Sequence, residues 1–468
     1  MSGARQIQTR VAIVGGGPAG MAAARELAKR GLESVILDEG RRLGGQIFRQ
    51  MPEGFESGIL PRYIAPSHKA GHHLIDDVVA SKVTVESGVA VWDIAPGQIS
   101  AEVDGQLLTV QADSILLATG AMDRALPFPG WTLPGSVTPG AAQVMVRGQM
   151  LRPGARAVVA GTGPLLLPTV TSLLAAGVEV VALLEANRIG GLVTTLPGVV
   201  FHPHRLREAA HYVKCFMGAG VRMQFGHAVL SAHAGVDGQL RSVALGKVDH
   251  DGYPIPGTER EVRADLLCVG YGLNPSTELA IRLGCEMHHS DDRGGWLPVH
   301  DEDMRTSVAG VLVAGEIAGI GGADVAMAEG RLAGLAIAAE FGCGDSGELA
   351  TWRRRCRKER QAADRLLSAF PVLPGLFALA QDNTIVCRCE DVTMAEVKAA
   401  SELYGSDLRS IKMATRAGMG PCQARICHRI VGGLLKEHCA GVESPVPCPS
   451  VQVPVKPVRA QTVAERWL

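Results

Sequence analysis

The sequence predicts an α/β protein with two parallel-sheet units and a small helical domain at its C-terminal end. Three observations support this expectation. They are a glycine-rich turn near the N-terminus, a second turn of the same plan after residue 155, and four cysteines close together after residue 385. With 468 residues, the chain is long enough for about three domains.

The composition excludes several classes of partner. A formal net charge of −1 gives no reason to expect binding to nucleic acid or to an anionic membrane surface. The polar start does not resemble a signal peptide. The longest apolar stretch, residues 165–185, contains Pro168, Gly177 and Glu179, so we expect a helix, a turn and a strand there rather than a membrane span. A cytoplasmic protein is expected, in which the 11 cysteines are thiols or metal ligands rather than disulfides.

The first glycine turn lies in the stretch VAIVGGGPAGMAAARELAKRGLESVILDEG, residues 11–40, which reads as strand, turn, helix and strand. Gly15 allows a tight turn, Gly17 lets the backbone approach a pyrophosphate, and Gly20 lets the helix pack on the strand. The helix begins at about Pro18 and Ala19, and its free N–H groups face the phosphates.

An acidic residue completes this pattern. Asp38 ends the second strand and can accept hydrogen bonds from ribose hydroxyls, with Glu39 as the nearby competitor. A lone glycine pattern is weak, but its position between a strand and a helix favours a dinucleotide site over a glycine turn without a ligand.

The second glycine turn begins at Ala155 and repeats this plan with one departure. Gly161, Gly163 and Pro164 form the turn and Glu185 ends the second strand, but Leu166 replaces the third glycine. Two interpretations stay open here: a retained fold with a lost or altered ligand, or a site for NAD(P) or another adenine nucleotide. Together the two turns predict two Rossmann-like domains.

Four cysteines predict a metal centre. Cys387 and Cys389 form C-x-C, and Cys422 and Cys427 form C-x4-C. C-x-C fits a zinc knuckle poorly, whereas a 2Fe–2S cluster spreads four thiolates over two irons. The chain has no C-x-x-C pair, so thiol–disulfide exchange is not expected.

Residues around the cysteines support an anionic centre. We expect glycine N–H groups to approach sulfur, a capping box of Thr393 and Glu396 to start one helix, and a second helix to begin at about Gln423. The positive charges expected near the centre are Arg388, Lys412, Arg416 and Arg425, and the glycines are Gly418 and Gly420.

Three further stretches resemble the two-dinucleotide-domain flavoprotein family that includes the pyridine-nucleotide disulfide reductases. They are LGGQIFRQ with Gly45 and Gln46, ADSILLATG with Thr119 and Gly120, and VLVAGEIAGIGG with Gly315 and Glu316. The resemblance implies FAD at the first site. It also implies that the carboxylate of Glu316, where the family more often has Asp, approaches the ribityl chain. The helix from about Ala323 is then expected to point its N-terminus at the flavin ring.

The cysteine segment resembles bacterioferritin-associated ferredoxin. More closely, CRCED and TRAGMGPCQARIC resemble the A-type subunit of opine oxidase, the B-type subunit of hydrogen cyanide synthase and the α-type subunits of dye-linked amino-acid dehydrogenases. The GTGPLLLP turn and the tail SVQVPVKPVRAQTVAE extend this likeness over nearly the whole chain. Ala424 replaces the family's Gly and is expected to be tolerated on a helix.

The resemblance implies FAD, a 2Fe–2S cluster and an electron-transfer subunit of a heteromeric dehydrogenase. Such an enzyme oxidises the C–N bond of an amino acid, an imino acid or an opine and passes electrons to a respiratory or quinone-type acceptor. A second flavoprotein subunit is expected as partner, with a further small subunit and a peripheral place at the inner membrane as open alternatives. The other candidate is a standalone NAD(P)H:acceptor flavin reductase. No catalytic base stands out in this chain.

The expected domain division has five parts. The basic helix after residue 346 reads as a solvated linker, with a docking surface as the alternative, and the proline-rich tail is expected to lie extended along its own subunit or a neighbour. The parts are 1–122 with 246–345 (the FAD domain), 123–245 (the second nucleotide domain), 346–380 (the linker), 381–440 (the cluster domain) and 441–468 (the tail).

Overall fold

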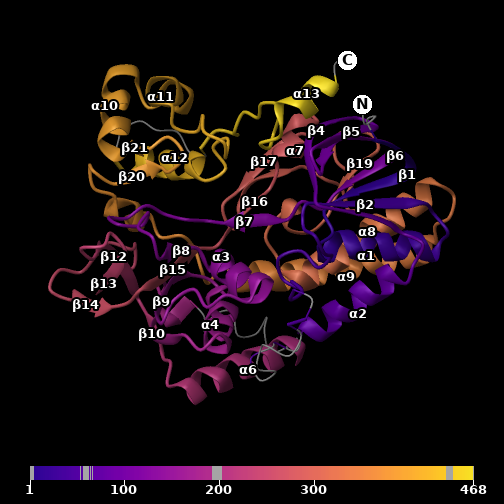
Figure 1. The fold of residues 1–468 in the computed structure, drawn as a ribbon. Helices are drawn as coiled ribbons and strands as arrows, with labels where there is room; N and C mark the ends of the chain where they lie inside the picture. The colour runs from indigo at the N-terminus through magenta and orange to yellow at the C-terminus, as the bar shows by residue number, and fades with distance from the viewer. Residues whose placement is uncertain are drawn as a thin grey trace.

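The computed structural model describes residues 5–52, 54–55, 63, 65, 67–191, 203–438 and 446–466. Figure 1 shows two α/β bodies, a helical domain above the second body, and a C-terminal segment that returns to the first. We call these parts the first domain, the second domain, the cysteine domain and the C-terminal arm (residues 446–466). The expected fold class is confirmed, and no helix among the described residues is long and apolar enough to cross a membrane.

The first domain is built on a seven-stranded sheet in the spatial order β3-β2-β1-β6-β5-β4, with β19 beside β6. Strands β1 and β2 run parallel in a register that pairs Val14 with Leu37. The residues that follow these strands, including the first glycine turn and Asp38, therefore meet at one edge of the sheet. The strands are β1 (Arg5–Val14), β2 (Ser34–Asp38), β3 (Thr84–Ser87), β4 (Val89–Ala95), β5 (Gln98–Val103), β6 (Gln106–Leu117) and β19 (Val311–Val313).

Helices α1 and α8 pack closely against each other on the first sheet. A Cβ atom at Gly330 would lie 2.0 Å from the Ala19 carbonyl oxygen, and one at Gly334 would lie 2.9 Å from the Ala23 oxygen. Only glycine allows the two backbones to approach this closely. The helical segments of this domain are α1 (Pro18–Lys29), α2 (Ser67–Val79), α7 (Glu278–Arg282), η3 (Gly315–Ala318), α8 (Ala323–Glu340) and α9 (Ser346–Leu367), and its hairpin is β17 (Met287–Ser290) with β18 (Gly295–Pro298).

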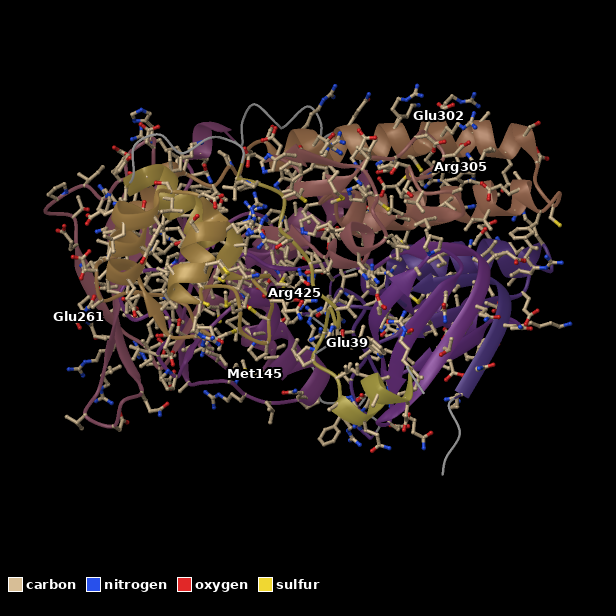
Figure 2. The ribbon with its side chains drawn as sticks, turned by 90° about the horizontal axis from the view of Figure 1, so that it is seen from above. Glu39, Met145, Glu261, Glu302, Arg305 and Arg425 are labelled. Carbon is tan, nitrogen blue, oxygen red and sulfur yellow. The ribbon has the colours of Figure 1, made fainter. Side chains whose placement is uncertain are left out.

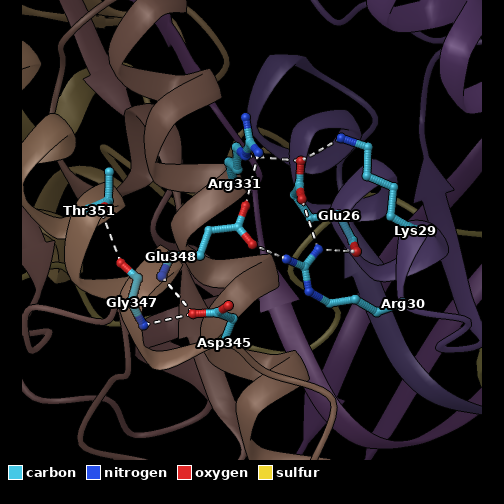
Figure 3. A network of polar contacts seen from close by, with 8 residues as sticks. All are labelled: Glu26, Lys29, Arg30, Arg331, Asp345, Gly347, Glu348 and Thr351. Atoms are coloured by element: carbon cyan, nitrogen blue, oxygen red, sulfur yellow. Dashed lines mark hydrogen bonds and ion pairs between the residues drawn. The ribbon is translucent and has the colours of Figure 1, made fainter.

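The basic helix α9 lies against α8, and ion pairs join the two to α1. Figure 3 shows Glu26 between Lys29, Arg30 and Arg331, with Glu348 of α9 facing Arg30 at 2.6 Å. Further along α9, the guanidinium of Arg360 is buried and donates to Glu329 of α8. One face of α9 is therefore packed into the first domain rather than surrounded by solvent.

The second domain has a five-stranded sheet in the order β11-β10-β9-β15-β8. The apolar stretch forms a helix, a turn and a strand, α4 and β10, as expected from its glycine and proline positions. The elements of this domain are β8 (Ser136–Val137), α3 (Pro139–Gln143), η2 (Val144–Gly148), β9 (Arg156–Thr162), α4 (Leu166–Ala175), β10 (Glu179–Glu185), α6 (Pro203–Ala219), β11 (Met223–Phe225), β12 (His227–Ala234), β13 (Leu240–Lys247), β14 (Arg260–Arg263) and β15 (Leu266–Tyr271).

Two short strands carry the chain between the first and second domains. Strand β7 (Ala121–Asp123) enters the second domain and pairs antiparallel with β16 (Leu273–Pro275), which leaves it. Strand β15 precedes β16 and pairs with β9 along the second sheet. We therefore propose that the second domain extends to the end of β15, beyond the boundary expected at residue 245.

The cysteine domain consists of short helices around a small strand pair. The expected capping box is confirmed, because Thr393 and Glu396 exchange hydrogen bonds at the start of α10. The helix expected from Gln423 begins later, at Cys427. The elements are η4 (Pro374–Leu379), β20 (Ile385–Cys387), β21 (Val392–Thr393), α10 (Met394–Tyr404), α11 (Leu408–Thr415) and α12 (Cys427–His438).

The C-terminal arm lies along its own chain, one of the two expected arrangements. The Val455 N–H donates to the Trp92 carbonyl at 2.8 Å, and the Arg459 N–H donates to Glu102 at 2.9 Å. The arm ends in α13 (Ala460–Glu465), against the first sheet. It therefore spans from the cysteine domain to the first domain.

Candidate cofactor sites

The first glycine turn has the shape of a phosphate cradle. Gly15 has φ +112°, and a Cβ atom there would lie 2.3 Å from the Ala118 oxygen. A Cβ atom at Gly20 would lie 1.9 Å from the Gly15 oxygen, whereas one at Gly17 would meet only the Gly45 Cα, at 3.8 Å. The turn is therefore closed on the protein side and open at Gly17, at the N-terminus of α1, which fits a pyrophosphate.

Asp38 is buried beside this turn and shapes it. Its carboxylate accepts hydrogen bonds from the N–H groups of Gly16 and Gly40, the latter at 2.6 Å. Burial raises the pKa of Asp38, although these backbone N–H groups oppose the rise. Glu39, the competitor, is exposed and pairs with Lys456 of the arm. Asp38 is thus the acid placed at the turn, and Glu39 is turned toward the arm.

The other residues expected at the first site gather around the same edge. Pro18 opens α1 and Ala19 follows it, packed against Gly315, where a Cβ atom would lie 2.9 Å from the Ala19 methyl. The backbone of Gly45 packs against that of Gly17. The next residue, Gln46, is exposed, and its side-chain oxygen accepts a hydrogen bond from Arg49. Segments 15–20, 43–50 and 315–322 are thus brought together from three parts of the chain.

The Glu316 side chain forms hydrogen bonds within the loop that follows it. Its carboxylate accepts from the Gly322 N–H at 2.7 Å and the Gly321 N–H at 3.4 Å, directly before α8. Burial raises the pKa of Glu316, against the effect of these N–H groups and of Arg360. The side chain therefore holds the glycine loop in place ahead of the α8 N-terminus, a role that the sequence did not suggest.

Thr119 and Gly120 are tied to a segment that motif analysis did not single out. The Thr119 hydroxyl donates to the Ser276 carbonyl at 2.6 Å, and the Ser276 N–H donates to the Gly120 carbonyl at 2.9 Å. No sequence signal links these residues, because Thr119 and Ser276 are separated by the whole second domain.

In the second glycine turn, the polar groups form hydrogen bonds to the carboxylate of Glu185. Glu185 accepts from the Thr162 hydroxyl at 2.7 Å, from the Gly163 N–H at 3.0 Å and from Asn187. Burial raises the pKa of Glu185 against these hydrogen bonds. Gly161 packs against Gly270, Pro164 is exposed, and Leu166 is buried in the core below the turn. Glu185 therefore holds the second turn in place, as Asp38 holds the first.

The four cysteines come together as two pairs. Cys387 and Cys427 contact each other in the interior, and Cys389 contacts Cys422 nearer the surface. The Cys427 thiol and the nearby backbone N–H groups lower the pKa of Cys387 to about 6, although burial opposes this. Among the described residues no three His, Cys, Asp or Glu side chains stand as they would around a single metal ion. Two thiol pairs fit a two-iron cluster, which needs two ligands for each iron.

Backbone groups also approach the sulfur atoms. The Gly418 N–H lies 3.5 Å from the Cys387 Sγ, as expected from the sequence. A Cβ atom at Gly420 would lie 2.4 Å from the Cys389 Cβ, so glycine is needed there for close approach rather than for donating to sulfur.

Two of the four positive charges expected near the cysteines form ion pairs. Arg416 pairs with Glu390 at 2.8 Å and Arg425 pairs with Glu278 at 2.7 Å. Arg388 is exposed and Lys412 is half-buried. The positive charges of Arg416 and Arg425 are therefore compensated by carboxylates.

Ala424 lies in a turn and not on a helix, contrary to the expectation. Its φ is +68° and that of Gln423 is +49°, so both have left-handed backbone. This conformation is strained for a residue with a Cβ atom and explains why α12 begins only at Cys427.

Comparisons with known proteins identify two families along the chain. A family model described as pyridine nucleotide-disulphide oxidoreductase matches residues 9–330, and one described as BFD-like 2Fe-2S binding domain matches residues 385–437. The A-type subunit of opine oxidase from Agrobacterium tumefaciens is 32% identical, over 97% of this chain and 90% of that protein. The HcnB subunit of hydrogen cyanide synthase from Pseudomonas aeruginosa is 33% identical, over 89% of this chain and 90% of that protein.

A solved structure supports the fold. L-proline dehydrogenase from P. horikoshii superposes with a TM-score of 0.72 at 20% identity, over 99% of this chain and 81% of that chain. The chain therefore belongs to the pyridine nucleotide-disulphide oxidoreductase family, in the group that includes HcnB and the A-type subunit of opine oxidase, and is an FAD-dependent oxidoreductase with a 2Fe–2S domain.

Proposed function

We propose that this chain is the electron-transfer subunit of a heteromeric dehydrogenase that oxidises the C–N bond of an amino acid, an imino acid or an opine. The observation that carries the proposal is the combination of a glycine cradle for FAD with four paired thiols in one polypeptide. FAD accepts two electrons as a hydride equivalent, and a 2Fe–2S cluster carries one at a time.

The residues of the first site have separate roles in this proposal. The open backbone at Gly17 and the N-terminus of α1 bind the pyrophosphate, and Asp38 fixes the turn and approaches the ribose. Gly45, Gln46, Thr119 and Gly315 line the path toward the flavin, and the α8 N-terminus, held by Glu316, faces the ring. The cluster ligands are Cys387, Cys389, Cys422 and Cys427.

Partners follow from the same reasoning. A second flavoprotein chain holds the substrate amine, as expected for a relative of chains that are themselves named subunits. Cys389 is exposed, so a respiratory or quinone-type acceptor can approach the outer thiol pair, directly or at the inner membrane through the complex.

Purification from the native cells under anaerobic conditions tests the proposal. We expect a second flavoprotein chain at a fixed ratio by mass spectrometry, and bleaching of the flavin by an amino acid, imino acid or opine in the complex. A chain that purifies alone, and whose flavin is bleached rapidly by NADH or NADPH, would instead identify a standalone reductase. Leu166, which replaces the third glycine of the second turn, argues against that outcome.

A further inference from the structure

The cysteine domain is joined to the first domain by a largely buried ion pair, whose first-domain partner, Glu278, lies in no cofactor motif. Arg425 lies between Cys422 and Cys427, and its Nε lies 2.7 Å from Oε1 of Glu278 in α7. The two side chains are only 11% and 21% exposed. Figure 2 shows Arg425 between the helices of the cysteine domain and the strands of the first sheet.

On the cysteine side, Arg425 is bound to the backbone that carries the thiols. Its guanidinium donates to the Cys422 carbonyl at 3.2 Å and to the Val455 carbonyl of the arm. The Val455 N–H in turn donates to Trp92 in β4. One side chain thus holds the outer thiol pair, the arm and the first domain together.

On the other side, Glu278 belongs to the segment that is tied to Thr119 and Gly120. Ser276, two residues before Glu278, exchanges two hydrogen bonds with that pair. Helix α7 is also fixed to β4, because Arg282 pairs with Asp93 at 2.8 Å. The position of Glu278 is therefore set relative to the edge of the first sheet where the flavin is proposed to bind.

We propose that the Glu278–Arg425 ion pair is the contact that positions the cluster for electron transfer from FAD, and that Arg425 is a positioning residue for this step. The inference rests on the proposed function of the two sites. A flavin reduced by a hydride equivalent would pass its two electrons to the oxidised cluster in two one-electron transfers, and its one proton would be released to solvent over the two transfers. A one-electron acceptor outside the chain must empty the cluster before the second electron follows.

The ion pair has the features that such a role requires. An Arg that binds a carboxylate and two carbonyls is fixed in both direction and distance, unlike an exposed ion pair. A second contact supports the same interface, since Arg429 of α12 donates to the Asn274 amide oxygen at 3.3 Å and to the Gly294 carbonyl. Loss of the ion pair is therefore expected to loosen the interface without unfolding either domain.

Flash reduction of the flavin in the holoprotein, followed by absorbance of flavin and cluster, measures the transfer rate directly. We expect Arg425→Met and Glu278→Gln each to slow it about tenfold or more, since small misplacements have large effects on such steps. Arg425→Lys keeps the charge facing Glu278 and should recover part of the rate. The matched control is Lys398→Met, which removes the exposed pair with Asp382 in the same domain and should leave the rate unchanged.

Potentiometric titration and metal analysis separate the possible results. Unchanged midpoint potentials and full iron content with a slower rate support the positioning role. An unchanged rate in both variants overturns it, as does a shift in potential large enough to explain the change in rate. Glu278→Gln lies outside the cysteine segment, so it tests the idea even if Arg425→Met fails to hold the cluster. Absence of FAD or of iron from the wild-type protein would refute the proposed function instead.

Discussion

Replacing Gly330 by alanine should lower both the stability of the first domain and its affinity for FAD. A Cβ atom at this position would lie 2.0 Å from the Ala19 carbonyl oxygen, roughly 1.5 Å short of ordinary contact. The opposing group is backbone in a buried helix, so it cannot turn aside, and α8 must move away from α1. Overpacking of this kind costs about 1 to 3 kcal/mol.

The displacement also reaches the cofactor site. Ala19 follows Gly17 by two residues, and α8 begins at Ala323 next to the glycine loop held by Glu316. Moving the two helices apart changes the distance between the phosphate cradle and the α8 N-terminus. We therefore expect a lower ratio of FAD to protein as well as a lower midpoint in urea denaturation.

A matched substitution separates this effect from the general effect of alanine in a helix. Gly218 lies in α6 with nothing within 4 Å of its Cβ position, so Gly218→Ala should be neutral or stabilise by up to about 1 kcal/mol. The measurements are urea denaturation followed by circular dichroism and flavin absorbance of the purified variants. If Gly330→Ala matched the wild type in both, the close contact of α1 with α8 would not be a constraint on the fold.

Three other substitutions test separate parts of the structure. Ala424→Gly should relieve the strain of the left-handed backbone at φ +68° and stabilise the cysteine domain by roughly 1 kcal/mol. The cluster absorbance should then be lost more slowly on heating. Equal or faster loss would contradict the left-handed conformation at this residue. Burial raises the pKa of Glu26, but Arg331, Arg30 and Lys29 together lower it below its usual value. Its stabilisation should therefore be complete above pH 4.5 and be lost as the pH falls through the lowered folded-state pKa. Glu26→Gln should lower the free energy of unfolding by about 2 kcal/mol at pH 7. In denaturation curves measured at decreasing pH, the difference in unfolding free energy between variant and wild type should shrink. A difference that does not change with pH would refute the lowered pKa of Glu26. Cys389→Ser should leave FAD bound but abolish the iron–sulfur EPR signal, and an unchanged signal would remove this cysteine from the proposed ligand set.

The sequence by itself determined the features that depend on local spacing. The turn at Gly15, Gly17 and Gly20 and the capping box at Thr393 follow from residues a few positions apart, whose backbone requirements are known. The two α/β units followed from the two glycine turns, and the small helical domain followed from the spacing of the four cysteines. The family resemblance added the cofactors and suggested the electron-transfer role proposed above.

Tertiary structure decided how distant segments meet and how individual side chains are used. The Gly330 contact, the packed face of α9, the Arg425–Glu278 pair and the engaged Glu185 all depend on groups brought together by folding. Ala424 was misplaced because a single residue type does not reveal a left-handed backbone, which the surrounding loop imposes against the residue's own preference. Local patterns specify what a short segment can do, whereas the partners of a buried charge or a close-packed glycine exist only in the folded chain.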